Sequence, residues 1–91
     1  MRNRWLAAWR TLKAENPEWA RSVHSAILEL YQHDCRCDTK EKIRYLRALV
    51  EILKEDSVRS EQLLGFPPRA GKRVYLWATT MGYLLIAEGE R

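Results

Sequence analysis

The most chemically varied stretch of this sequence is His33-Asp34-Cys35-Arg36-Cys37-Asp38. Thiolates and imidazoles bind zinc, but a structural zinc site normally needs four such ligands, with about two to four residues between paired cysteines. Here three ligands stand at every second position, and only His24 remains as a distant fourth. A Cys–His nucleophile would also need a third group to orient it, and none can be identified. We therefore expect a polar connection with reduced cysteines, and we expect no metal, cofactor or catalytic residue.

A second stretch, Gly65-Phe-Pro-Pro-Arg-Ala-Gly71-Lys72-Arg73, is superficially similar to a phosphate-binding P-loop. It has five residues between the glycines where the motif has four, and Arg73 stands where a metal-binding Ser or Thr is required. The two prolines also remove backbone amides that would otherwise bind phosphate. The remaining carboxylates form no acid–base pair, so we expect a protein that is not an enzyme.

Basic residues gather in two segments of a chain whose net charge is +4. Residues 1–14 and residues 69–73 contain bases and no acid, whereas residues 15–68 are nearly balanced. If the two segments meet in space, they create a positive surface suited to a polyanion. The candidate binding residues are Arg4, Arg10, Lys13, Arg44, Arg47, Arg69, Lys72 and Arg73.

Most of the elements that must position these residues are predicted to be helices within a single domain, residues 1–91. The first follows Asn3 and runs to about Ala14, with Trp5, Trp9 and Leu12 on one face. The second begins at Asn16-Pro17, a capping side chain followed by proline, and ends near Gln32.

The third predicted helix is opened by Asp38 and Glu41, a variant of the capping box. Its apolar stripe is wide enough to be covered on two sides, which predicts a central position in the bundle. The stripe consists of Ile43, Leu46, Val50 and Leu53, widened by Tyr45, Leu49 and Ile52. Ser57 is expected to cap a short fourth helix that ends at Leu64, before Gly65 and two prolines.

The last segment admits two structures. Apolar spacing favours a helix over residues 69–81, with either state possible beyond Gly82. Residues 73–88 also fit a β-hairpin with a turn at residues 80–82. The fold class predicted is therefore all-α, a small bundle of four to five helices, with a helical bundle plus C-terminal hairpin as the alternative.

Residues 57–86 resemble a helix-turn-helix or winged-helix segment. The resemblance is carried by a short helix ending at Leu63-Leu64-Gly65, a Pro-containing turn, a basic helix start and Gly82-Tyr83-Leu84. It implies that the second helix enters the major groove of DNA and that Arg69, Lys72 and Arg73 contact phosphates or bases. It also implies that Gly82 ends that helix and that residues 83–85 begin a strand.

Two functions follow as expectations. The first is a module that binds nucleic acid or a nucleoprotein complex, with about six phosphate contacts and steep salt dependence. The alternative is a small protein-binding adaptor or inhibitor, of a kind common in phages and mobile elements, with some of the four Trp and four Tyr as anchors. The broadly apolar third helix is also compatible with a homodimer.

The location expected is the cytoplasm. No stretch reaches the apolar length that spans a bilayer, and the N-terminal residues lack the pattern of a secretory signal. Two cysteines are also typical of a reducing compartment.

Overall fold

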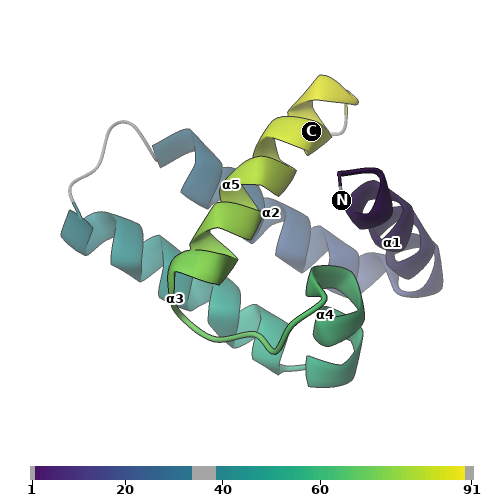
Figure 1. The fold of residues 1–91 in the computed structure, drawn as a ribbon, viewed down its shortest axis with the longest axis horizontal. Coiled ribbons are helices and arrows are strands. Elements are labelled where there is room, and N and C mark those ends of the chain that lie inside the picture. Colours follow the sequence, from purple (N-terminus) through teal and green to yellow (C-terminus); the bar gives the residue numbers. More distant parts are fainter. Residues whose placement is uncertain (1, 34–38, 90–91) are drawn as a thin grey trace.

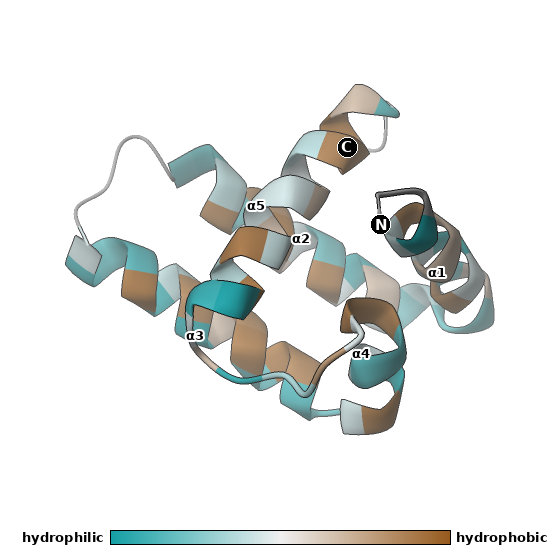
Figure 2. Ribbon diagram, viewed as in Figure 1, coloured by the Kyte–Doolittle hydropathy of each residue, from teal (hydrophilic) through white to brown (hydrophobic). Residues whose placement is uncertain are grey.

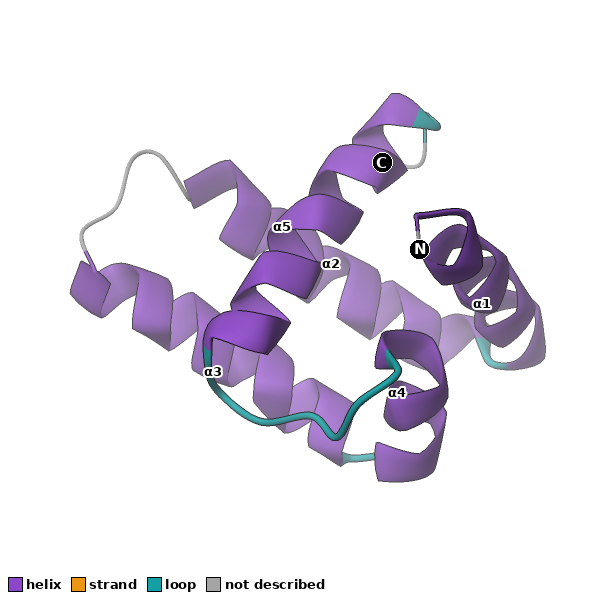
Figure 3. Ribbon diagram, viewed as in Figure 1, coloured by secondary structure: helices purple, strands orange, loops and turns teal. Residues whose placement is uncertain are grey.

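The computed structural model describes residues 2–33 and 39–89, and within this part the chain forms five α-helices and no strand (Figure 1). The helices are α1 (Arg2–Glu15), α2 (Pro17–His33), α3 (Thr39–Lys54), α4 (Ser57–Leu64) and α5 (Lys72–Ala87). The predicted all-α bundle is confirmed, and the C-terminal hairpin is wrong, as Figure 3 shows. The Cys-containing cluster after His33, with Asp38 of the predicted capping box, lies outside the described residues.

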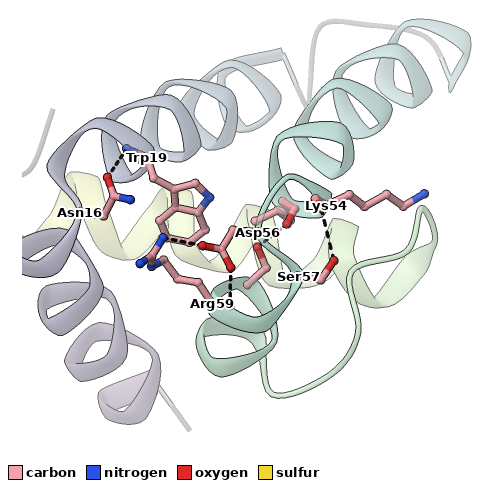
Figure 4. Close-up of polar contacts among 8 residues, drawn as sticks. Asn16, Trp19, Lys54, Asp56, Ser57 and Arg59 are labelled. Atoms are coloured by element: carbon pink, nitrogen blue, oxygen red, sulfur yellow. Dashed lines mark hydrogen bonds and ion pairs between the residues drawn. The ribbon is translucent and has the colours of Figure 1, made fainter.

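The boundary between α1 and α2 follows the predicted signal. The backbone N–H of Trp19 donates to Asn16 Oδ1 over 3.1 Å, so Asn16 caps α2 while Pro17 occupies its first position (Figure 4). The α1 helix begins at Arg2 rather than after Asn3, so Asn3 lies within the helix and is not its cap.

The start of α4 corrects the predicted cap. Asp56, not Ser57, is the N-cap: its Oδ1 accepts from the Arg59 backbone N–H (3.0 Å), and its Oδ2 pairs with Arg59 Nη1 (2.6 Å). Ser57 instead donates its hydroxyl to the carbonyl oxygen of Lys54 (Figure 4). A carboxylate that both caps the helix and pairs with Arg59 satisfies two groups at once, which a serine cannot do.

The α5 helix continues through Gly82 because this glycine allows a close helix crossing. Gly82 is buried, and a Cβ placed on it would lie 2.6 Å from Tyr31 Cβ in α2. Gly82 therefore serves packing between α2 and α5 rather than a turn, which explains why the alternative structure, the hairpin, is wrong.

The helices surround one core. The α2 helix contacts α1, α3 and α5, and α4 packs against α1 and α3 (Figure 1). Figure 2 shows hydrophobic residues on the inward sides of the helices. The α3 helix does contact three neighbours, α2, α4 and α5, but Ile43 is 41% exposed, so the inner stripe of α3 is narrower than predicted. The largest fully buried side chains include Trp9, Trp77, Ile27, Leu30, Leu49, Leu53, Leu63, Met81 and Leu85.

Candidate nucleic-acid interface

Residues of α1, of the end of α4 and of α5 surround a hollow of about 280 Å³, here called the aromatic hollow. It is lined by Arg4 and Trp5 of α1, by Leu64, Gly65 and Phe66 at the end of α4, and by Arg73, Leu76 and Trp77 of α5. A second hollow of about 470 Å³, the loop hollow, is lined by Phe66, Pro67, Arg69, Ala70, Gly71, Lys72 and Arg73. Because Phe66 and Arg73 line both, the two hollows adjoin.

Arg73 is positioned by an aromatic ring. Its guanidinium carbon lies 4.1 Å from the centroid of the Phe66 ring, the separation of a cation–π contact. Phe66 itself is half-buried and packs against the core, so its ring is a fixed support. Arg73 remains exposed to solvent. The guanidinium is thus held at the boundary of the two hollows with donors available for an anion.

Arg4 is placed by the end of α4. Gly65 has φ +89°, the left-handed conformation that ends many helices, and its N–H donates to the Glu61 carbonyl oxygen. A Cβ at Gly65 would lie 3.4 Å from Arg4 Nη2, so the Arg4 guanidinium lies close over this glycine. The residue that ends α4 is therefore also a neighbour of the cation from α1.

The charge around the hollows has one sign. Four cations line them, and no carboxylate, histidine or cysteine does so among the described residues. The first turn of α5 holds no acid, and its N-cap Gly71 has no side chain to accept from the first amides. The positive end of the α5 dipole therefore adds to the same field. We call Arg4, Arg69, Lys72 and Arg73 the basic rim.

The basic rim contains four of the eight predicted site residues. Arg10 is directed elsewhere, because its Nη2 pairs with Glu88 Oε2 at 3.4 Å near the end of α5. The other three predicted residues are exposed but line neither hollow: Lys13 on α1, and Arg44 and Arg47 on α3.

The winged-helix part of the resemblance is wrong. The α5 helix passes through Gly82 to Ala87, so residues 83–85 are helical and no strand follows within the described part. The two helices α4 and α5 also lack the tight connection and the mutual packing of a helix-turn-helix. The connection spans residues 65–71, and α4 makes its main contacts with α1 and α3 rather than with α5.

Sequence reasoning missed three apolar residues of the aromatic hollow, Leu64, Phe66 and Leu76. Two tryptophans, Trp5 and Trp77, also line this hollow. Trp5 is half-buried, whereas Trp77 is only 1% exposed. The available signal was a single aromatic residue directly before two prolines in a basic segment. That signal does not predict the conformation of residues 65–71, and the contact between Phe66 and Arg73 depends on this conformation.

Two further observations concern the described residues only. None of their His, Cys, Asp and Glu side chains form a group of three or more that could hold a metal ion. No helix among them combines the length and the apolar character needed to cross a bilayer.

Comparison of this chain with protein-family models, curated proteins and solved structures finds no match.

Proposed function

We propose that this chain is a non-enzymatic module that binds nucleic acid, alone or within a nucleoprotein complex, through the basic rim. The observation that carries the proposal is that Arg4 of α1 and Arg73 of α5 line the same hollow, although they are far apart in sequence. Arginine donors bind phosphate oxygens with charge-assisted hydrogen bonds. Among the described residues, four cations and no carboxylate line the adjoining hollows, which favours a polyanion over a neutral ligand.

The absence of catalytic groups in the hollows supports a binding role. General acid–base catalysis requires a titratable side chain within hydrogen-bonding reach of the substrate. The described residues that line the two hollows offer only guanidinium, ammonium, aromatic and aliphatic groups. These groups can hold and orient an anion.

Binding is tested by fluorescence anisotropy, with labelled DNA and RNA strands titrated at low salt. We expect saturable binding that weakens in Arg4→Ala and in Arg73→Ala. The matched control is Arg21→Ala, which removes the same charge from an exposed position on α2 that lines neither hollow. Equal losses in all three variants would show only a general charge effect, and an absence of binding by the wild type would refute the proposal.

The alternative, a small protein-binding adaptor or inhibitor, is favoured by one observation. On α5, Leu76 and Tyr83 are 67% and 54% exposed and lie seven residues apart, so they share a face of the helix. Exposed Tyr is typical of interface anchors. A salt-tolerant, stoichiometric protein partner that is lost in Tyr83→Ser, together with no nucleic-acid binding, would favour this function over the first.

A further inference from the structure

The aromatic hollow has the composition of a site for a flat, partly apolar group beside a phosphate. Its apolar lining includes Trp5, Phe66, Leu76 and Trp77, while Arg4 and Arg73 supply the charge. Its volume of about 280 Å³ is just below the range of about 300–1,000 Å³ found for small-ligand sites. Such a hollow suits one nucleotide rather than an extended groove of bases.

We infer that the aromatic hollow takes an unpaired base of a single strand, while the basic rim binds the adjacent phosphates. This inference rests on the proposed function and specifies the kind of nucleic acid. Single strands present unstacked bases, which proteins bind on aromatic rings and on arginine planes. Arg73 lies over the Phe66 ring and is exposed, so its guanidinium is available to a base or a phosphate.

A duplex fits this arrangement less well. The bases of a duplex are stacked and paired, so only their edges and the outer phosphates are accessible. Readout in the major groove requires an element that projects from the protein. Here Arg4 and Arg73 line a concave site between α1, the end of α4 and α5. The concave site therefore selects for a strand whose base can leave the stack.

Trp77 lines the aromatic hollow, but its ring is only 1% exposed. Its Nε1 is buried and has no hydrogen-bond partner among the described residues, although buried donors are usually paired. Trp19 Nε1 is unpaired in the same way but belongs to a ring that lines neither hollow.

The test compares three labelled ligands with the wild-type protein at one salt concentration. They are a single strand of about ten nucleotides, within the usual site size, a strand of the same length made only of abasic deoxyribose phosphates, and a duplex. Because base–aromatic stacking contributes about 1–3 kcal/mol per base, we expect the normal strand to bind at least about fivefold more tightly than the abasic strand. The duplex should bind more weakly than the normal strand.

The variant Phe66→Leu tests the same site without removing charge. Because Phe66 also supports Arg73, affinity for both strands should fall. We expect the larger loss for the normal strand, so the preference between the two strands falls. Tyr83→Leu is the matched control, since Tyr83 is an exposed aromatic residue on α5 that does not line the hollow.

The outcomes separate the two claims. If all three ligands bind equally well, or if the duplex binds best, the inference about an unpaired base is overturned while nucleic-acid binding stands. If none of the three binds, the proposed function itself fails. The comparison of normal and abasic strands uses the unmodified protein, so it holds even if Phe66→Leu does not fold.

Discussion

At the scale of single residues, substitutions of Arg73 can distinguish the contribution of its charge from that of its planar guanidinium, which lies over the Phe66 ring. The guanidinium carbon lies 4.1 Å from the ring centroid, and a lysine ammonium would keep the charge without the planar group. We expect Arg73→Lys to weaken binding of a normal single strand about two- to fivefold, the size of an exposed cation–π contribution. Anisotropy titrations of this variant beside Arg73→Ala measure the difference. A lysine variant as weak as the alanine variant would mean that charge alone is insufficient, whereas wild-type affinity would mean that the stacked plane is irrelevant.

The cap of α4 gives a second prediction at this scale. Asp56 accepts from the Arg59 backbone N–H and pairs with the Arg59 side chain, whereas Ser57 makes only a 3.3 Å contact with the Lys54 carbonyl oxygen. We expect Asp56→Ala to lower the free energy of unfolding by about 1 kcal/mol, the usual contribution of an N-cap. Ser57→Ala should change it by less than about 0.5 kcal/mol, as surface substitutions usually do. Urea denaturation measures both free energies of unfolding. A larger loss in Ser57→Ala than in Asp56→Ala would indicate that Ser57 is the N-cap.

At the scale of elements, Gly82 sets the distance between α2 and α5. Replacing an exposed mid-helix glycine with alanine would stabilise a helix by about 0.8–1 kcal/mol. Here the added Cβ would lie 2.6 Å from Tyr31 Cβ, and overpacking costs about 1–3 kcal/mol. Crowding therefore outweighs helix propensity, and we expect Gly82→Ala to be destabilised in urea denaturation.

The control for this prediction follows from the atom that would clash. Because the nearest atom is Tyr31 Cβ, Tyr31→Ala would leave that atom in place and should not rescue Gly82→Ala. Gly82→Ala at or above wild-type stability would show that α2 and α5 can separate at no cost.

The sequence predicts most elements because local signals specify them. Asn16-Pro17 and Gly65 mark helix boundaries that the structure confirms, and the apolar spacing of α1 and α3 identifies most of their core residues correctly. The error at Gly82 has a tertiary cause, because a glycine in a turn and a glycine at a helix crossing look alike until Tyr31 is placed beside it.

At the scale of the whole molecule, the sequence identifies two basic segments but not which side chains meet. Arg4 and Arg10 are both on α1, yet Arg4 lines the aromatic hollow while Arg10 pairs with Glu88, 78 residues away. That division depends on how α1 packs against α4 and α5. Local periodicity contains no information about such packing. A list of basic residues taken from the sequence therefore includes side chains that do not line the hollows.

The central claim, that Arg4, Arg69, Lys72 and Arg73 act as one surface, is tested most directly by the salt dependence of single-strand binding. Four phosphate contacts predict a slope of about −2.8 for log K against log salt, or about a 50-fold loss of affinity between about 50 and 200 mM. This is a smaller dependence than six contacts would give.

The slope should be measured for the wild type and for three single variants. Arg4→Ala and Arg73→Ala should each reduce its magnitude by about 0.7. Arg10→Ala should leave it unchanged, because that side chain is engaged with Glu88. A slope near zero in the wild type, or an equal reduction in Arg10→Ala, would contradict the account.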